Sequence, residues 1–392
     1  MKRLLLIALL IAALPYVRSP IYRFPPPTPF TGSQFYDPYG DAAGDWRQNA
    51  WQRTNLHAHS RAWVGLTNGQ QSDEEVVRAY RALGYSVPGL SNYHYISMVP
   101  DGAGLPMYEH GYNLGKRHQL AVGARKVEWF DFPLFQSTNQ KQFIIDLMKR
   151  NSELVGITHP SGRDSYSSDD LRQLTGYQLI EVVNGPFADD EPWDAALSTG
   201  RLVWGMANDD NHDINDRLRM GLSWNMVHST TNPSDVLSAL KGGHFYSVFR
   251  LDDHPNAALT EIANYTFHDG TLTITCAGAI PAFEFFGQNG VIKKTVRDTL
   301  TASYTFDAND TYIRTIIWAP RHVIYLNPIV RWDGHQVPTP VAMVDQTATW
   351  IMRLSVAGAA AFVVMVFRRP LYLTGPKHFS APIASDTGET PA

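Results

Sequence analysis

Residues 55–60 read Asn-Leu-His-Ala-His-Ser, at the end of a strand-like stretch. Side chains alternate along an extended chain, so His57 and His59 point to the same side and can share one metal ion. A single His-x-His pair is weak evidence by itself. It gains weight from the residues that end the strands further along the chain.

The region from residue 45 to 250 alternates short apolar runs with helical patterns, which predicts βα units around a mostly parallel sheet. Five successive predicted strands end at side chains that can bind metals. The carboxyl ends of barrel strands meet at one face, where such folds build their sites. We therefore expect one metal centre formed by seven side chains: His57, His59, His94, Glu128, His159, Asp210 and His212.

The alternative explanation is that the candidate histidines follow predicted strands by chance, because the chain also has histidines elsewhere. Chance histidines would be scattered over helices and both ends of a barrel, whereas the five candidates lie at one predicted end beside two carboxylates. We favour ligation. No metal role is expected for the others: His110, His118, His228, His244, His254, His268, His322, His335 and His378.

Two further regions have clear patterns. Ser72 and Glu75 predict a capping box that begins the first helix, and Gly84 predicts its end. Beyond residue 258 the apolar period drops to two, with hairpin turns at 269–270 and 289–290, which predicts a small β-sandwich over 251–337. The single cysteine, Cys276, lies in this pattern and is expected in its core; it excludes an intramolecular disulfide and a multi-cysteine zinc site.

The two ends of the chain suggest a membrane. Residues 1–19 read as a signal sequence or N-terminal anchor, and 20–44 as a stiff Pro-rich linker. Residues 346–369 predict a C-terminal transmembrane helix, with a packed or amphipathic helix as the alternative, and 370–392 predict a disordered tail. Basic residues at 2–3 and 368–369 predict both termini in the cytoplasm and an extracytoplasmic folded region.

Composition excludes several classes of protein. The 392 residues are 44% hydrophobic and 18% charged, which argues against a largely disordered chain. The formal net charge is −4 and no Lys/Arg block is present, so nucleic acid is not an expected partner.

Residues 50–250 resemble the PHP (polymerase and histidinol phosphatase) superfamily of metal-dependent phosphoesterases. The motifs that carry this resemblance are 55–60, Leu90 to His94, His159-Pro160 and Asp210-Asn211-His212. The segments 127–129, 179–185 and 312–314 resemble its carbaryl-hydrolase-like branch. The resemblance implies a distorted (β/α)7 barrel with two or three metal ions, and ester or carbamate hydrolysis in some members.

The resemblance also implies a ligand scheme. One ion would be bound by His57, His59, Glu128 and Asp210; Glu128 would bridge to a second ion at His159, and His94 and His212 would serve a third. The chain departs from the family at Tyr93, Asn68 and the stretch 130–135, where a histidine is missing. Asp131 is the candidate substitute there.

The ligand types favour divalent transition-metal ions, Zn²⁺, Mn²⁺ or Fe²⁺. The resemblance, together with the number of candidate ligands, implies one to three of them. The leading hypothesis is a membrane-anchored, extracytoplasmic hydrolase of a small-molecule phosphoester that uses a metal-activated water. The alternatives are hydrolysis of a carboxylic ester, carbamate or amide in the same site, and a degenerate barrel that binds a ligand without turnover. Arg163 is a candidate phosphate-binding residue or a solvated loop residue.

Overall fold

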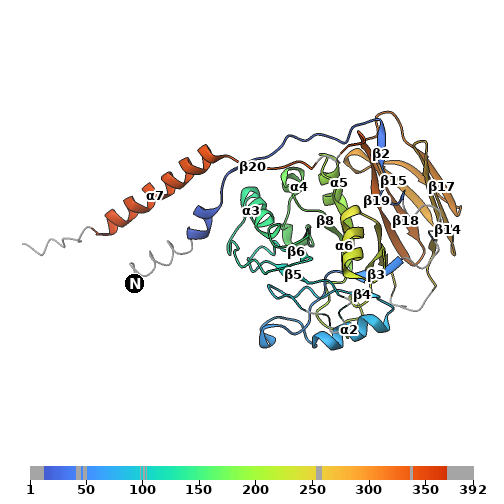
Figure 1. The fold of residues 1–392 in the computed structure, drawn as a ribbon, viewed down its shortest axis with the longest axis horizontal. Coiled ribbons are helices and arrows are strands. Elements are labelled where there is room, and N and C mark those ends of the chain that lie inside the picture. The colour runs from blue at the N-terminus through green and yellow to red at the C-terminus, as the bar shows by residue number, and fades with distance from the viewer. Residues whose placement is uncertain are drawn as a thin grey trace, which may run out of the picture.

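The structure, a computed structural model, describes residues 13–40, 46, 51–97, 99, 102, 104–252, 258–335 and 339–368. These residues form a mixed α/β fold, as predicted, with helices and short strands beside a large antiparallel β region (Figure 1). The predictions for residues 1–12 of the N-terminal segment and for the 370–392 tail fall outside the described residues.

The first sheet has the strand order β10-β8-β7-β6-β5, with β9 beside β8. Strands β7, β8 and β10 run parallel, and every residue in them is buried, which is typical of a parallel sheet covered on both faces. The strands are β5 (Met107–His110), β6 (Gln119–Val122), β7 (Leu154–Ile157), β8 (Leu179–Asn184), β9 (Phe187–Ala188) and β10 (Trp204–Asn208).

Strand β6 runs against the direction of this sheet. It pairs antiparallel with both β5 and β7, so Gln119 at its amino end lies opposite His110 and Ile157 at their carboxyl ends. An antiparallel pair needs only a short connection, so residues 111–118 join β5 to β6 without a crossover helix. The amino end of β6 therefore lies beside the carboxyl ends of β5 and β7.

The second sheet has the order β16-β15-β18-β19-β12-β11-β3-β4, with β2 beside β19. It combines strands from both predicted regions of the chain. The strands are β2 (Gln34–Tyr36), β3 (Trp51–Asn55), β4 (Val87–Pro88), β11 (Ser223–His228), β12 (Phe245–Arg250), β15 (Ala282–Gly287), β16 (Val291–Val296), β18 (Tyr312–Ala319) and β19 (His322–Trp332).

The two sheets do not show the closed (β/α)7 barrel that the resemblance implies, because β3 and β4 belong to the second sheet. Side chains join the sheets where a backbone ladder would close such a barrel. The Asn225 amide on β11 exchanges two 2.9 Å hydrogen bonds with the backbone of Ala207 on β10, and the Ser247 hydroxyl donates to the Gly205 carbonyl.

The region predicted as a β-sandwich continues the second sheet. Arg250 on β12 is paired with His322 on β19, so this sheet runs through the predicted boundary at residue 250. A three-stranded sheet of β13 (Glu261–His268), β14 (Thr271–Ala277) and β17 (Thr301–Thr305) packs on it through a shared apolar core. Cys276 is buried in that core, and the 269–270 hairpin turn joins β13 to β14, as predicted.

The first helix confirms its sequence signals. It is α2 (Asp73–Ala82), with the Ser72–Glu75 capping box formed and Gly84 at a positive φ after its last turn. The other helices are α3 (Thr138–Met148), α4 (Ser168–Gln173), α5 (Glu191–Leu197), α6 (Pro233–Gly242), α7 (Gln346–Arg368) and the short 3-10 turns η2 (Trp63–Gly65), η3 (Gly162–Asp164) and η4 (Gln288–Gly290).

The predicted linker lies against the folded region. Strand β1 (Tyr22–Arg23) pairs with β20 (Met343–Val344) and β2 pairs with β19, while Phe30 and Tyr39 are buried. Beyond β20, Gln346–Met365 of α7 is long and apolar enough to cross a membrane, and only 6% of its most apolar window is buried. This degree of exposure is unlike that of a packed core helix.

Candidate metal centre

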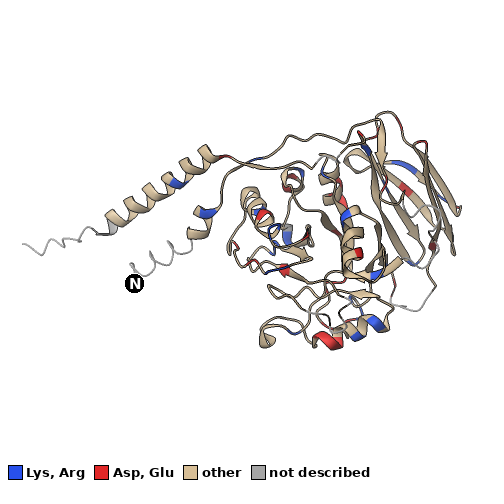
Figure 2. Cartoon of the chain, viewed as in Figure 1, with Lys and Arg blue, Asp and Glu red and all other residues tan. Residues whose placement is uncertain are grey.

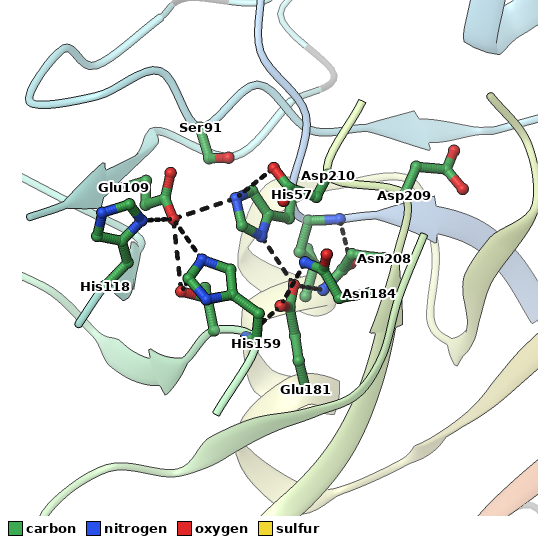
Figure 3. Close-up of polar contacts among 12 residues, drawn as sticks. His57, Ser91, Glu109, His118, His159, Glu181, Asn184, Asn208, Asp209 and Asp210 are labelled. Carbon is green, nitrogen blue, oxygen red and sulfur yellow. Dashed lines mark hydrogen bonds and ion pairs between the residues drawn. The ribbon is translucent and has the colours of Figure 1, made fainter. Parts of the chain in front are cut away.

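The centre forms where the loops after β3, β7 and β10 meet the end of β5 and the start of β6 (Figure 3). The loops after β3 and β10 pair at Ala58 and Asn211, with hydrogen bonds from His59 N to Asn211 O and from Asp210 N to His57 O. On the other side, Tyr93 pairs with Glu109 of β5. These backbone pairings bring residues far apart in the sequence within reach of one another.

Glu109 lies at the middle of the cluster and is fully buried. Its Oε1 lies 3.4 Å from His57 Nε2, 3.3 Å from His159 Nε2 and 2.7 Å from His118 Nδ1. Its Oε2 lies 3.2 Å from His59 Nε2. One carboxylate therefore faces four imidazoles.

Asp210 completes the cluster from the loop after β10. Its Oδ1 lies 3.3 Å from Nε2 of each of three histidines, His57, His59 and His212. Three groups of side chains have ligand atoms close enough together to hold a metal ion: His57 with His59 and Glu109, His59 with Asp210 and His212, and Glu109 with His118 and His159.

The distances and the unpaired atoms test whether a metal fits. In a tetrahedral site with bonds of about 2.0–2.1 Å, ligand atoms lie ~3.3–3.4 Å from one another, whereas a charge-assisted N–H···O bond is ~2.7–2.9 Å. Most of the nitrogen–oxygen separations here match the metal geometry. Buried atoms without a hydrogen-bond partner include His57 Nε2, His59 Nε2, Glu109 Oε2 and Asp210 Oδ1. The donor set and its geometry fit a divalent transition metal.

A second carboxylate orients the first histidine. Glu181 on β8 accepts a 2.8 Å hydrogen bond from His57 Nδ1 and another of 2.8 Å from the His159 backbone N–H. The Asn208 and Asn184 amides each donate to Glu181 at 2.9 Å. Because Nδ1 is bonded to Glu181, Nε2 is the ring nitrogen of His57 that faces the centre and would bind a metal ion, as in carboxylate–histidine–metal arrangements.

The electrostatics of the cluster favour the charged forms of its carboxylates. Burial raises the pKa of Glu109, but His118 and His57 outweigh it and hold that pKa well below its usual range. The pKa of Asp210 is also held well below its usual range, because His57, His212 and His59 outweigh the effect of burial. Burial lowers the pKa of His57, but Asp210, Glu181 and Glu109 raise it well above its ordinary value. Two buried carboxylates among imidazoles thus create a strongly cation-attracting site.

Five of the seven predicted ligands are brought together: His57, His59, His159, Asp210 and His212. Two of them hold unusual backbone conformations, with φ of 30° at His159 and 47° at Asp210. Non-glycine residues rarely adopt this region, and such strain is often found at functional sites.

The structure does not bring Glu128 into any of the three groups of described residues. Its Oε1 accepts a hydrogen bond from the Phe130 backbone, and its own N–H is donated to the Tyr108 hydroxyl. Glu128 follows β6, whose carboxyl end points away from the centre, so the loop must return along β5. The expectation assumed a parallel strand here.

His94 also remains outside the groups, because both of its ring nitrogens are engaged by the backbone. Nδ1 lies 3.0 Å from the Glu128 carbonyl, and Nε2 accepts a 3.0 Å hydrogen bond from Gly111 N–H. Asp131, the candidate substitute ligand, is buried and accepts hydrogen bonds from Tyr112, Phe132 and Gln136.

Sequence reasoning missed Glu109 and His118, and it assigned no metal role to His118. Glu109 lies on a four-residue strand, and His118 directly precedes the antiparallel β6. A signal was present: the turn-like stretch from Gly111 to Lys116 separates two short apolar runs, which is typical of a hairpin. A hairpin there would have placed His118 two positions before the residue opposite Glu109, close enough for their side chains to meet.

A cavity of about 640 Å³ opens over the centre. His118, His159, Asp210 and His212 lie in its wall, together with Tyr93, whose ring stacks on His59 at 4.5 Å. Asn68 also lies in this wall, but it belongs to none of the groups. Three cationic side chains line the same cavity: Lys116, Arg163 and Arg219.

No family model and no curated protein sequence matches this chain.

Proposed function

We propose that this protein is a metal-dependent hydrolase of anionic esters, most simply phosphoesters. The observation that carries the proposal is the convergence of unpaired nitrogen and oxygen atoms on Glu109 and Asp210 beneath a cavity lined by three cations. The carboxylates would hold the metal, and Lys116, Arg163 and Arg219 would provide charge for the oxygens of a phosphate.

The groups support two ions. One nitrogen binds one ion, so the two groups that share His59 Nε2 would share an ion, held by five side chains: His57, His59, Glu109, Asp210 and His212. His118 and His159 would hold the second ion, and Glu109 would bridge the pair. Divalent zinc, manganese or iron bound here would polarise the ester and lower the pKa of a water molecule.

The protein's own residues perform the remaining tasks. Glu181 keeps His57 in the orientation that faces the centre, and His57, His59 and Glu109 form a buried floor beneath the cavity. The cations on the cavity wall would bind and orient the ester. The Ser161 hydroxyl donates to Asp189 in the cavity wall, but neither residue belongs to the metal-binding groups, so we assign the attack to a water activated by the metal.

We also propose, as the finer account of the fold, that the two sheets are the opened walls of a PHP-type barrel. The pairing of residues 58 and 211 and that of residues 93 and 109 link the sheets around the centre, and the Asn225 amide links β10 to β11. The antiparallel β5–β6 pair would be the main distortion.

Localisation forms part of the proposal. We infer that α7 crosses a membrane and that the folded region is extracytoplasmic, as the basic residues at positions 2–3 and 368–369 predict. A C-terminal reporter that is active only outside the cytoplasm should remain silent.

Two matched variants test the proposed centre. Glu109→Gln removes the negative charge of the carboxylate that would bridge the two ions. Metal content and hydrolysis of model phosphomonoesters and phosphodiesters should therefore fall by orders of magnitude. Glu128→Gln makes the same chemical change outside the cluster and should retain most of both. If Glu128→Gln is the inactive variant, the scheme implied by the resemblance holds instead of the one proposed here.

The hydrolase proposal itself would fail if the folded wild type, loaded with Zn²⁺ or Mn²⁺, cleaved neither class of phosphoester. Carboxylic esters and carbamates belong in the same assay. Turnover of these alone would assign the alternative chemistry to the same centre.

A further inference from the structure

The base of α7 is fixed against the folded region by the N-terminal segment. The Arg353 guanidinium donates to the carbonyls of Val17 and Arg18, at 3.2 and 3.1 Å. Tyr16 stacks on Phe135 with ring centroids 4.5 Å apart, and its hydroxyl accepts hydrogen bonds from the 134–135 backbone. Both segments project from the same side of the molecule (Figure 1), so the loop around residue 135 lies at the foot of the candidate span.

Along α7 the surface is almost uncharged. Figure 2 shows it without acidic residues and mostly uncharged. The sequence places one basic residue, Arg353, near its start and another, Arg368, at its last position. Large apolar side chains on it, such as Ile351, Leu354 and Phe362, are more than 60% exposed. A helix with this surface needs an apolar environment along its length, which the described residues do not provide.

A series of exposed apolar side chains leads from this foot to the cavity. We define the apolar stripe as nine exposed residues: Trp63, Val64, Leu66, Tyr95, Tyr112, Leu114, Trp129, Leu134 and Phe135. Val64 is fully exposed and Leu66 is 89% exposed.

Contacts make the stripe continuous. Leu114 N–H is bonded to the Pro133 carbonyl beside Leu134, and His94 contacts both Tyr112 and Trp129. Trp129 then contacts Trp63, with ring centroids 5.6 Å apart. The Trp63 indole N–H is bonded to the carbonyl of Tyr93, a residue of the cavity wall. The stripe thus reaches the rim of the cavity.

We propose that the apolar stripe lies in the interfacial layer of the bilayer that α7 crosses, so that the substrate is an anionic ester of a membrane amphiphile. Tryptophan and tyrosine favour this layer because their rings are apolar and their N–H and O–H groups remain hydrated. Continuity with the candidate span favours a bilayer over a protein partner. The cations of the cavity wall would receive the headgroup. This inference rests on the proposed function for its chemistry, but not for the position of the stripe.

The position can be tested without turnover. The full-length protein is reconstituted in phosphatidylcholine–phosphatidylglycerol vesicles with a single introduced cysteine, Val64→Cys, that carries an environment-sensitive fluorophore. The native Cys276 does not compete, because it is buried and burial raises its pKa to about 12. The matched control is Val291→Cys, exposed on β16 and outside the stripe.

Lipids with a quencher attached to the acyl chain should quench the label at position 64 several-fold more than the label at position 291, and should shift its emission to the blue. Equal quenching at the two positions, or quenching of neither, would overturn the inference. Because this readout needs neither metal nor substrate, it can fail while the proposed hydrolysis holds, and the reverse.

Turnover tests the substrate class. Wild type should hydrolyse phosphatidic acid in vesicles faster than its water-soluble short-chain analogue. The double variant Val64→Glu, Leu66→Glu should lower the ratio of bilayer to soluble turnover about tenfold, since each charge opposes entry into the interface. An unchanged ratio, or hydrolysis of the soluble ester alone, would overturn the assignment of a membrane substrate.

Discussion

Glu181 is a buried residue at the floor of the cavity that we expect to control metal binding through the histidines it holds. It accepts hydrogen bonds from the His57 ring, the His159 backbone and two asparagine amides. The prediction is that Glu181→Gln lowers metal affinity ~10–100-fold, because an amide no longer fixes the His57 tautomer or raises the basicity of its ring.

Competition with a chromophoric chelator would measure this affinity in the purified protein. Glu153→Gln is the control, since Glu153 pairs at the surface with Arg125 and Lys241, away from the centre. Equal affinities in the two variants would remove Glu181 from the account of the centre.

Lys116 is the cation whose role in substrate binding is most open to test. It lines the cavity with its ammonium 5.9 Å from the centre of the Tyr93 ring. Lys116→Met keeps the length of the side chain and removes the charge. A charge-assisted contact is worth about 1.5–3 kcal/mol, so kcat/KM for a phosphoester should fall ~10–100-fold.

Metal content should remain that of wild type in Lys116→Met, because the lysine is not a ligand. Lys126→Met, an exposed lysine outside the cavity, is the control and should leave kcat/KM near wild type. A loss of metal in Lys116→Met would show that the lysine acts on the fold of the centre and not on the ester.

At the scale of elements, the 111–131 segment depends on a neutral histidine. Burial, reinforced by His110, lowers the pKa of His94 to about 3. Its Nε2 accepts the Gly111 N–H, so protonation would break that bond. The unfolded chain, with a histidine pKa of ~6.5, takes up the proton first as the pH falls. The free energy of unfolding should therefore decrease between pH ~6.5 and ~3, with a slope from this residue that approaches ~1.4 kcal/mol per pH unit.

Urea unfolding of the detergent-solubilised protein at pH 7, 6, 5 and 4 would measure that slope. His94→Gln should flatten it, whereas His268→Gln, at an 86% exposed side chain, should not. Parallel curves for wild type and His94→Gln would contradict the assigned protonation state.

The elements also show what the sequence could predict. The residue types that end β3, β7 and β10 were sufficient to find His57, His59, His159, Asp210 and His212, because ends of neighbouring strands meet at one edge. Glu109 and His118 were not found, because strand direction is not encoded in the apolar pattern. Because β6 pairs antiparallel with its neighbours, its amino end faces the centre instead of its carboxyl end. His118, which precedes β6, therefore lies in the cluster, and Glu128, which follows it, does not.

The same limit applies to the barrel. Buried runs predicted strands β7, β8 and β10, but sheet membership depends on long-range pairing. The side-chain amide of Asn225 lies between β10 and β11, where a backbone ladder was expected. Nothing in the amino-acid sequence distinguishes an asparagine that links two strands in this way from one that is exposed to solvent.

At the scale of the whole molecule, a buried ion pair joins the two predicted regions. Arg314 on β18 is 1% exposed and donates from Nε to Asp194 of α5 at 2.8 Å, and the Tyr312 hydroxyl donates to the same carboxylate. A second contact, 2.7 Å long, links Arg314 to Asp190. With a sheet continuous through residue 250, these contacts predict that residues 51–335 unfold in one cooperative transition.

Asp194→Ala tests that coupling. It leaves the Arg314 guanidinium buried with one of its two carboxylates removed, and breaking such a pair costs about 3–5 kcal/mol. The control Asp169→Ala removes an exposed i,i+3 partner of Arg172 and should cost less than ~1 kcal/mol. Urea unfolding followed by tryptophan fluorescence and by circular dichroism should show one coincident transition for each variant, shifted in Asp194→Ala. Two separated transitions in wild type would show instead that the barrel-like and β-rich regions are independent, and that the ion pair only docks one on the other.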